Sequence, residues 1–390
     1  MNTLNQDQLA RRIANTDWDF EGVKSESRFA DFHWQPGKFA SQLPAALIGL
    51  LSEKKETVLD PFCGSGTTLV EAQRLQRQSI GFDINPISQL IATAKLVRQP
   101  SQRLREIIEV LITDAESSTF PDIFNDLEID SFVPRTVQKK WYTRHVLLSL
   151  TSLFESIAEY NGIRSVLARA AFSSILLSVC REYRHWGYVC DNTTPPLDSN
   201  RGADVFHCYR SALKQLSLAY EERDSYLKLT GGSLNHIPNC EAQCTDAIMG
   251  LQTVSNCSVE LVVTSPPYFG VVDYVKAQRL SFEWFGLDIE SLRRKEIGAR
   301  SKRHRITAQS DYVKEISAVL REVKRVLKPH RFAAFVIGES KARAATIDTV
   351  VSEARIHGLT KFMQIDRKVS IQRRQMPTVQ EEQVIVFQNC

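Results

Sequence analysis

The feature that most constrains this chain is the stretch ETVLDPFCGSGTTLVEAQRLQRQSIGFDINP, which starts at Glu56. Its apolar runs, glycines and helical spacing predict, in order, a strand, a glycine-rich turn, a helix and a second strand, over residues 57–59, 60–66, 67–76 and 79–82. A strand–helix–strand unit of this kind builds a parallel sheet with helices on its faces. The chain is therefore expected to have an α/β fold.

The same alternation of strands and helices continues elsewhere in the chain. Apolar, β-branched runs predict further strands over VELVVTS, RFAAFVIGES, FMQIDRKVS and EEQVIVFQ. Helical spacing predicts helices over QLPAALIGLLS, ISQLIATAKLV, DYVKEISAVLREVKRVL and TIDTVVSEARIHG. Residues 1 to about 45 look irregular and polar. After the strand over residues 79–82, strand patterns are expected to return only at about residue 259.

Helical periodicity dominates from about residue 101 to 230, in HVLLSLTSLFESIAEY, SVLARAAFSSILLSVC and FHCYRSALKQLSLAYEERDSYLKL. We interpret this region as a mostly helical insertion into the α/β domain. The expected division is residues 1–100 for the N-terminal segment and the first half of the sheet, 101–235 for the insertion, and 236–390 for the second half.

The bulk properties set few limits on function. No apolar run of about 18 residues is evident, so no transmembrane helix is expected. The first residues lack the apolar core of a signal peptide, and the eight cysteines are widely spread, which favours the cytoplasm. A formal net charge of +4 is compatible with a polyanionic partner but does not indicate one.

The turn DPFCGSGTT is a candidate ligand site. Gly64 and Gly66 permit positive φ and close approach of a ligand, and the helix behind them presents free amide groups. Asp83 ends the next strand, where its carboxylate can accept hydrogen bonds from both hydroxyls of a ribose. Asp60 would repel a pyrophosphate and favour a cation. This mixture suits S-adenosylmethionine, which carries an ammonium, a carboxylate, a sulfonium and a nucleoside.

The alternative is a glycine-rich turn that binds nothing, because a lone G-x-G is a weak signal. The dinucleotide-binding fingerprint fails here, since Leu69 stands where its third glycine would be. No P-loop sequence occurs in the chain either.

A second candidate is the turn Ser265-Pro266-Pro267-Tyr268, which ends the apolar strand VELVVTS. Two prolines stiffen the turn, so the Ser265 hydroxyl and a backbone carbonyl can accept hydrogen bonds from one planar amine. Such a grip favours a tetrahedral amine with a free lone pair, and Tyr268 offers a face on which a base can stack. The alternative is a strand-ending turn with a packed tyrosine.

Together, DPFCGSGTT, GFDINP and TSPPY resemble the signature motifs of the amino-group DNA methyltransferases, over roughly residues 33–98 and 240–390. The resemblance implies a Rossmann-like, seven-stranded sheet, S-adenosylmethionine as cofactor and double-stranded DNA as partner. Serine at the start of the last motif is typical of N4-cytosine enzymes, whereas Asp or Asn is usual for N6-adenine enzymes. The resemblance therefore favours N4 of cytosine and keeps N6 of adenine as the alternative.

The resemblance also implies roles for individual residues. The segment HWQPGKFASQLPAALI is similar to the N-terminal cofactor segment of the family, and CTDA is similar to its next motif. The expected cofactor residues are Lys38, Phe39, Asp60, Pro61, Phe62, Gly64, Gly66, Thr67, Asp83 and Asp246. The expected catalytic residues are Ser265, Pro266, Pro267 and Tyr268. The long insertion departs from the usual motif spacing, so the place where DNA sequence is read stays open. The sequence also leaves open the recognition site, the oligomeric state and a partner restriction nuclease.

The segment SLRRKEIGARSKRHR is the main candidate for contacts to DNA phosphates, and its alternative is a solvated loop. Its basic residues are Arg293, Arg294, Lys295, Arg300, Lys302, Arg303 and Arg305. A second cluster comprises Arg181, Arg184, His185, Trp186 and Tyr188, for which a helix end with aromatic side chains in the core is the alternative. Weaker candidates are Lys276, Arg279, Arg373 and Arg374.

The cysteines and the Pro-Pro turn bear on other possible functions. Methylation at carbon-5 of cytosine uses a thiolate that follows a proline, and no cysteine here follows a proline. No metal is expected, because His236, Cys240, Cys244 and Cys257 lack the spacing of a standard zinc finger. An RNA methyltransferase and a non-catalytic nucleic-acid-binding module stay as alternatives, and a nicotinamide dehydrogenase leaves the Pro-Pro turn without a purpose.

Overall fold

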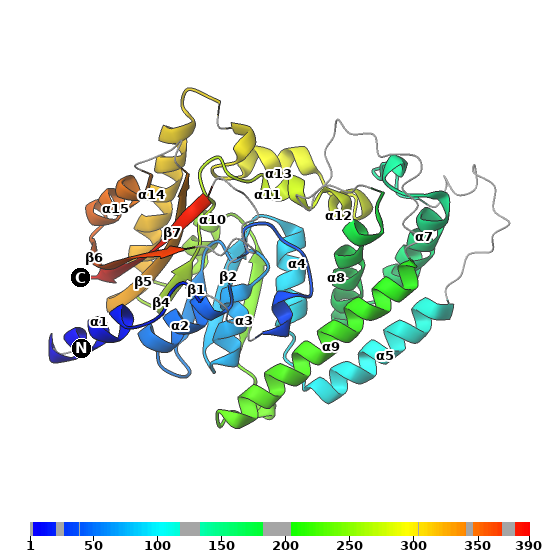
Figure 1. Ribbon diagram of the computed structural model, residues 1–390, viewed down its shortest axis with the longest axis horizontal. Coiled ribbons are helices and arrows are strands. Elements are labelled where there is room, and N and C mark those ends of the chain that lie inside the picture. The colour runs from blue at the N-terminus through cyan, green and yellow to red at the C-terminus, as the bar shows by residue number, and fades with distance from the viewer. Residues whose placement is uncertain are drawn as a thin grey trace.

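A computed structural model of the chain contains one seven-stranded sheet with the strand order β3-β2-β1-β4-β5-β7-β6 (Figure 1). The structure describes residues 3–20, 27–38, 40–117, 133–181, 204–302, 304–340, 346–368 and 379–390. The strands are β1 (Thr57–Asp60), β2 (Gln78–Asp83), β3 (Cys240–Cys244), β4 (Val259–Thr264), β5 (Leu327–Ser340), β6 (Leu359–Lys368) and β7 (Val379–Asn389). This sheet confirms the seven strands and the Rossmann-like α/β class expected from the sequence.

The order of the strands determines where a ligand can bind. Strands β3, β2, β1, β4 and β5 run parallel, whereas β7 runs antiparallel to both β5 and β6. The chain passes from β1 outward to β2 and β3, and then returns to the other side of β1 to form β4. In open α/β sheets, such a reversal leaves a crevice at the carboxyl ends of the strands. The predicted crevice therefore lies beyond β1, β2 and β4.

Helices cover both faces of the sheet and form a separate group beside it. They are α1 (Thr3–Ala14), α2 (Gln42–Leu51), α3 (Thr67–Arg74), α4 (Pro86–Lys95), α5 (Ser101–Ser117), α7 (Arg144–Ala158), α8 (Gly162–Val179), α9 (Val205–Leu229), α10 (Ala247–Thr253), α11 (Tyr274–Ala277), α12 (Arg279–Trp284), α13 (Ile289–Lys295), α14 (Ala308–Val326) and α15 (Thr346–Ile356). Short 3-10 turns are η1 (Arg28–Ala30), η2 (Lys139–Trp141), η3 (Leu234–His236) and η4 (Arg300–Lys302).

The alternating side chains of the central strands explain why both faces are covered. Leu59 and Val262 belong to the core under α10, α14 and α15. Val58, Leu261 and Val263 belong to the core under α1 and α2. Because successive residues of a strand point to opposite faces, continuous apolar strands such as VELVVT require a helical layer on each side.

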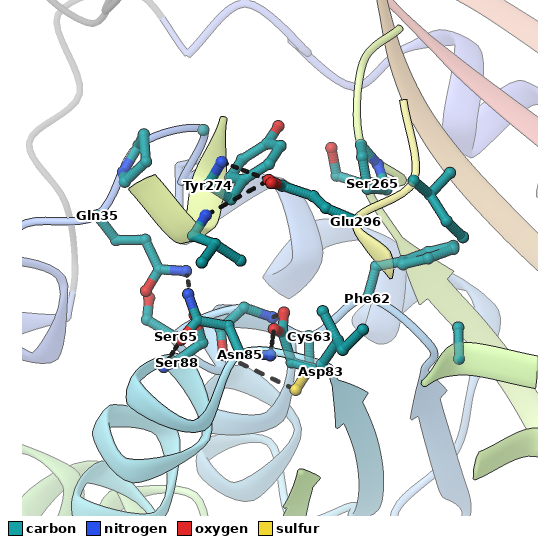
Figure 2. Close-up of a pocket in the computed structure, with 18 of the residues that line it drawn as sticks. Gln35, Phe62, Cys63, Ser65, Asp83, Asn85, Ser88, Ser265, Tyr274 and Glu296 are labelled. Atoms are coloured by element: carbon teal, nitrogen blue, oxygen red, sulfur yellow. Dashed lines mark hydrogen bonds between the residues drawn. The ribbon is translucent and has the colours of Figure 1, made fainter. Parts of the chain in front are cut away.

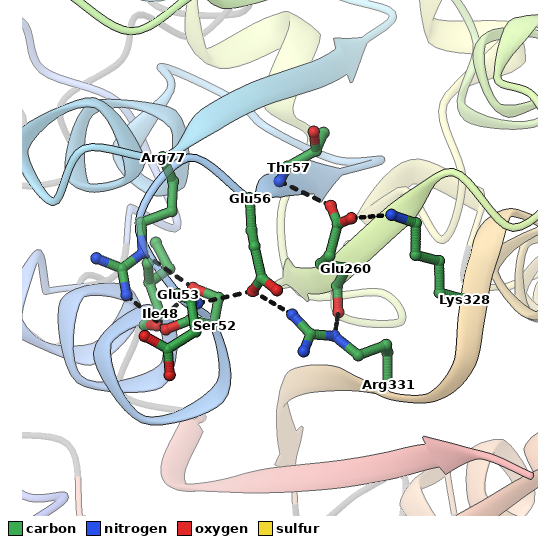
Figure 3. A network of polar contacts seen from close by, with 9 residues as sticks. All are labelled: Ile48, Ser52, Glu53, Glu56, Thr57, Arg77, Glu260, Lys328 and Arg331. Atoms are coloured by element: carbon green, nitrogen blue, oxygen red, sulfur yellow. Dashed lines mark hydrogen bonds and ion pairs between the residues drawn. The ribbon is translucent and has the colours of Figure 1, made fainter. Parts of the chain in front are cut away.

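The opposite end of these strands is held by ion pairs (Figure 3). Arg331 pairs with Glu56, and Lys328 pairs with Glu260. Glu260 also accepts a hydrogen bond from the Thr57 amide at 2.9 Å, which ties the start of β1 to β4. Polar side chains thus fasten the amino ends of the strands, while the carboxyl ends face the crevice.

The helices of residues 101–229 pack mainly on one another and on α4, at the right of Figure 1. Within the described residues, α8 is the one helix long and apolar enough to cross a membrane by length and composition, which the sequence analysis did not expect. A core helix passes the same test, and α8 packs against α4, α5, α7, α9 and α12. Its Phe172 is fully buried against Trp284 of α12, which fits a core helix.

Two expectations about secondary structure were wrong. Residues 3–14 form the helix α1 instead of irregular chain, because Leu9 and Ile13 are buried in the same core as α2. Strand structure also returns before residue 259, at β3. This edge strand buries only Cys240 and Ala242, so its local sequence CEAQC carries little apolar signal.

Candidate active site

A pocket of about 890 Å³ lies at the carboxyl ends of β1, β2 and β4 (Figure 2). Both predicted turns contribute to its wall. The predicted residues that line it are Lys38, Pro61, Phe62, Gly64, Thr67, Asp83, Asp246, Ser265, Pro267 and Lys295.

Other predicted residues lie near this pocket without lining it, or lie outside the described residues. Asp60, Gly66, Pro266 and Tyr268 belong to the two turns but are not part of the pocket wall. Phe39 and Arg303 fall outside the described residues, as do Arg184, His185, Trp186, Tyr188, Arg373 and Arg374.

The glycine turn has the backbone geometry that its sequence predicts. Gly64 has a φ of +51° and Gly66 a φ of +80°, a region that favours glycine. A Cβ at Gly66 would lie 2.8 Å from the Cβ of Ala92 on α4. The turn therefore combines a left-handed backbone with close packing against α4, and α3 begins directly behind it at Thr67.

Asp83 connects the glycine turn to the end of β2. Its carboxylate accepts hydrogen bonds from the amides of Gly64 and Asn85, at 3.0 and 2.8 Å. Burial raises the pKa of Asp83 to about 6, against the lowering effect of these two amides, and nearby Asp60 raises it further. Asp83 is thus an acceptor held in place on the pocket wall.

Asp60 lies behind the pocket wall, with 1% of its surface exposed. Its carboxylate accepts a hydrogen bond from the Thr264 hydroxyl at 2.6 Å and one from the Phe62 amide at 3.0 Å. Burial raises the pKa of Asp60 to about 6. Because Thr264 is the last residue of β4, Asp60 joins the glycine turn to the start of the Ser-Pro-Pro-Tyr turn.

The Ser-Pro-Pro-Tyr turn is held by contacts on two sides. The Tyr312 hydroxyl of α14 donates to the Pro267 carbonyl at 3.1 Å. The Tyr268 hydroxyl donates to Glu382 of β7 at 2.9 Å, and the Ser265 hydroxyl is 3.4 Å from the Tyr268 oxygen. Glu382 in turn pairs with Arg367 at 2.5 Å. These contacts fix the turn against the sheet.

Several pocket residues were not predicted from the sequence. Gln35 donates to the Ser88 hydroxyl at 3.0 Å, and Asn85 donates to Gln278 at 2.9 Å while its side-chain oxygen caps α4. Gln35, Asn85, Ser88, Tyr274, Val275 and Glu296 line the pocket. Gln35 and Asn85 stand inside the quoted motifs HWQPGK and GFDINP, which was a usable signal. Tyr274 stands in no quoted motif, and Glu296 stands in the basic segment SLRRKEIGARSKRHR without having been singled out.

Glu296 is the pocket residue with the most unusual environment. It is 3% exposed, and one carboxylate oxygen accepts hydrogen bonds from the amides of Tyr274 and Val275. Among the described residues, its other oxygen is buried without a hydrogen-bond partner. Burial raises the pKa of Glu296 to about 8, and Asp273 and Asp83 add to that rise. Figure 2 shows its side chain near Tyr274 and Ser265, with Asp83 across the pocket.

The basic segment 291–305 runs beside the Ser-Pro-Pro-Tyr turn. Backbone hydrogen bonds join Gly270 to Gly298 at 2.7 Å and Arg300 to Val272 at 3.2 Å. Within this segment, Arg294, Lys295 and Arg305 are exposed, whereas Arg293, Arg300 and Lys302 are half-buried.

Some basic side chains of this segment are bound to partners within the protein. Arg293 pairs with Glu290 at 2.7 Å, and the Lys302 ammonium donates to the carbonyls of Arg294 and Glu296. Outside the segment, Arg279 pairs with Glu283 at 2.6 Å.

Lys38 and Asp246 complete the predicted cofactor wall. The Lys38 ammonium donates to the Ala30 carbonyl, and burial lowers its pKa. Asp246 caps α10 by accepting from the Ile248 amide at 2.9 Å. Both residues therefore have structural contacts in addition to their place on the pocket wall.

The pocket fits S-adenosylmethionine in the chemistry of its wall. Asp83 can supply an acceptor for ribose hydroxyls, Gly64 brings its backbone to the pocket wall, and Phe62, Ala247 and Ile297 offer apolar surface for an adenine ring. No cluster of His, Cys, Asp or Glu able to hold a metal ion occurs among the described residues.

Comparisons with known proteins find similarity to DNA methyltransferases. Residues 4–93 match the family model of the N6/N4 DNA methylases. The chain is 24% identical to the Type II methyltransferase M.MjaII of Methanocaldococcus jannaschii, with 83% of this chain and 76% of that protein covered. It is 26% identical to M.BsoBI of Geobacillus stearothermophilus, with 70% and 56% covered, and 24% identical to M.MvaI of Kocuria varians, with 73% and 64% covered.

The match thus spans less than two thirds of the length of the last two relatives. Within the part that is matched, the family model covers the glycine turn and Asp83, the residues that the sequence analysis assigned to the cofactor. The cofactor of this family is S-adenosylmethionine. These matches support the resemblance of this chain to the amino-group DNA methyltransferases, the family that comprises the N6-adenine and N4-cytosine enzymes.

Proposed function

We propose that this protein methylates the exocyclic amine of a base in double-stranded DNA, at N4 of cytosine. The observation that carries the proposal is that Ser265 and Asp83 line one pocket. A ribose-binding acid and an amine-binding turn must share a cavity if a methyl group is to pass between their ligands. These two residues are far apart in the sequence, so their meeting is a property of the fold.

The residues of the first turn would hold the cofactor. Asp83 accepts hydrogen bonds from the ribose hydroxyls, and the turn around Gly64 contacts the methionine part. Phe62 and Asp246 flank the adenine. When bound, S-adenosylmethionine supplies an electrophilic methyl group on a sulfonium.

The residues of the second turn would hold the target base. The Ser265 hydroxyl and the Pro266 carbonyl accept hydrogen bonds from the amine, which orients its lone pair toward the cofactor side of the pocket. Tyr268 stacks on the ring of a base that has left the duplex. The Tyr268 hydroxyl is held by Glu382, which supports this role by restricting the orientation of the ring.

DNA would approach the pocket over the segment 291–305. Arg294, Lys295 and Arg305 are exposed beside the catalytic turn, where they can neutralise phosphates. Flipping the target base costs a few kcal/mol, which these contacts help to offset. The helical insertion, residues 101–235, is our candidate for reading the DNA sequence, and we place the protein in the cytoplasm with its DNA.

Serine in the first position of the catalytic turn favours cytosine over adenine. Methylation of N6 of adenine is the alternative within the same chemistry. Both bases present an exocyclic amine next to a ring nitrogen, so the pocket wall alone is compatible with either.

The deciding experiment expresses the chain in a host that lacks DNA methylation and maps modified bases by single-molecule sequencing. N4-methylcytosine at a defined site is expected, and N6-methyladenine would replace the cytosine assignment. A host carrying Ser265→Ala serves as the matched control and is expected to show no modification. Labelled methyl transfer to duplex DNA but not to structured RNA separates this proposal from an RNA enzyme. Absence of any transfer favours the non-catalytic module.

A further inference from the structure

Methylation of an exocyclic amine leaves one proton without an assigned acceptor. The amine nitrogen gains a carbon and must lose a hydrogen to return to neutrality. The Ser265 hydroxyl and the Pro266 carbonyl orient the amine, but neither is a base of useful strength near neutral pH. A proton acceptor, if the protein supplies one, has to reach the same pocket.

Glu296 is the candidate for such an acceptor. It lines the pocket together with Ser265 and Pro267, and it is 3% exposed. Its first oxygen is held by two amides of α11, which fixes the carboxylate in place. Its second oxygen is buried without a hydrogen-bond partner among the described residues. A buried acceptor left unsatisfied costs stability and calls for an explanation.

We propose that the free oxygen of Glu296 accepts the proton that the target amine releases during methyl transfer. The amine lone pair forms the new bond to the methyl carbon, and the pair of the broken sulfur–carbon bond stays on the sulfur. The pair of one N–H bond returns to the nitrogen as its proton moves to the Glu296 oxygen. The products of this step are a neutral methylated amine, a neutral thioether and a protonated Glu296. This inference rests on the proposed function.

The electrostatic surroundings suit this role. Burial and two neighbouring carboxylates, those of Asp273 and Asp83, disfavour the ionised form of Glu296 and so raise its pKa. A carboxylate with a higher pKa is a stronger base. The Lys302 ammonium is bound to the Glu296 backbone carbonyl. The titratable or charged groups that line the pocket with Glu296 or neighbour it are Lys38, Asp83, Asp273, Tyr274, Lys295 and Lys302.

The pH dependence has a definite sign. Burial raises the pKa of Glu296 to about 8, and only its ionised form accepts a proton. The transfer rate should therefore rise with pH and level off at or below about pH 8, because a cationic ligand in the pocket lowers this pKa. A group that instead donated a hydrogen bond to the base would give a rate that falls over the same interval.

The test is Glu296→Gln, which keeps the size of the side chain and its acceptor for the α11 amides. Single-turnover methyl transfer is expected to slow by about 10²-fold or more, the usual contribution of a general base. Affinity for S-adenosylmethionine, measured by calorimetry, is expected to stay unchanged, and the rise of the rate with pH is expected to disappear. Glu290→Gln, an exposed glutamate on α13, is the matched control and should leave the rate unchanged.

A second measurement does not depend on activity. The pKa of Glu296 lies above its ordinary value of 4.5, so the folded state binds the proton more tightly than the unfolded state. The wild type should lose stability relative to Glu296→Gln as pH rises from about 4.5 to about 8, in thermal melts of the protein without ligand.

Three outcomes would overturn the inference. Equal rates of the wild type and Glu296→Gln would remove the proton acceptor role while leaving the proposed function intact. A weakened cofactor affinity with full rate at saturation would make Glu296 a cofactor contact instead. A wild type with no methyl transfer to any DNA would overturn the proposed function, and this inference with it.

Discussion

The two turns at the carboxyl edge of the sheet differ in how they use the backbone. The turn after β1 depends on glycines with positive φ, and its Gly64 amide donates to Asp83 at the pocket wall. The turn after β4 depends on two prolines and on hydroxyl contacts from Tyr312 and to Glu382, which hold it rigid. The difference suggests that the first turn makes room for a ligand, whereas the second positions a reacting group.

The largest expected effect comes from the second turn. Ser265→Ala should slow methyl transfer by about 10²–10³-fold, comparable to the loss of one transition-state hydrogen bond in other enzymes. The cofactor affinity should not change, because Ser265 belongs to the amine site. Rapid-quench assays measure the rate of methyl transfer, and calorimetry measures the cofactor affinity. A loss of cofactor affinity with an unchanged rate would assign Ser265 to the cofactor site instead of the amine site.

The next effect concerns the first turn. Asp83→Ala should weaken cofactor binding by about 10–100-fold, since a hydrogen bond to a charged group contributes about 1.5–3 kcal/mol. Because burial raises the pKa of Asp83 to about 6, the affinity of the wild type should fall as pH falls through about 6. Calorimetric titrations across this interval would contradict the assignment if wild type and variant behaved alike.

A smaller effect tests whether the glycine geometry itself matters. Gly66→Ala should destabilise the fold by at least about 1–2 kcal/mol, because an L residue is strained at a φ of +80° and its Cβ would approach Ala92. Gly49→Ala is the control, since a Cβ there meets nothing within 4 Å, and it should stabilise the protein by about 0.5–1 kcal/mol. Urea unfolding measures the free energy of unfolding of both variants. Equal free energies would show that the positive φ of Gly66 does not matter for stability.

The smallest effect is expected at the outer side of the second turn. Tyr268→Phe removes the hydroxyl contact to Glu382 but keeps a ring that can stack on a base. A loss of about 1 kcal/mol in stability is expected, with cofactor affinity unchanged. Tyr268→Ala should impair binding of the target base as well. If both variants had the same affinity for DNA, stacking by Tyr268 would be excluded.

Much of the sheet was predictable because its signals are local. The βαβ unit around Gly64 and Gly66 combines an apolar strand, a turn and a helix within a short stretch, and the structure places β1, α3 and β2 there. The edge strand β3 escaped prediction, because only one face of an edge strand with few neighbours needs to be apolar. Helix α1 escaped it as well, since two buried side chains are too few to give a clear period.

The pocket residues likewise divide into those that a local motif identifies and those that only the fold brings to the pocket. Ser265 and Asp83 could be singled out from their motifs, and Gln35 and Asn85 lay within quoted motifs without being recognised. Glu296 stands in a segment whose sequence reads as a basic loop. Its burial depends on α11 and on the backbone pairing between Gly270 and Gly298, which no local pattern reports.

By itself, the sequence determined the local geometry of the two turns and the α/β class, because glycine, proline and apolar period act within a few residues of chain. The tertiary structure alone decided that the turns share one pocket and that a buried glutamate joins them there. The physical reason is the strand order: β4 forms far along the chain but pairs beside β1, and only that pairing brings Ser265, Asp83 and Glu296 together.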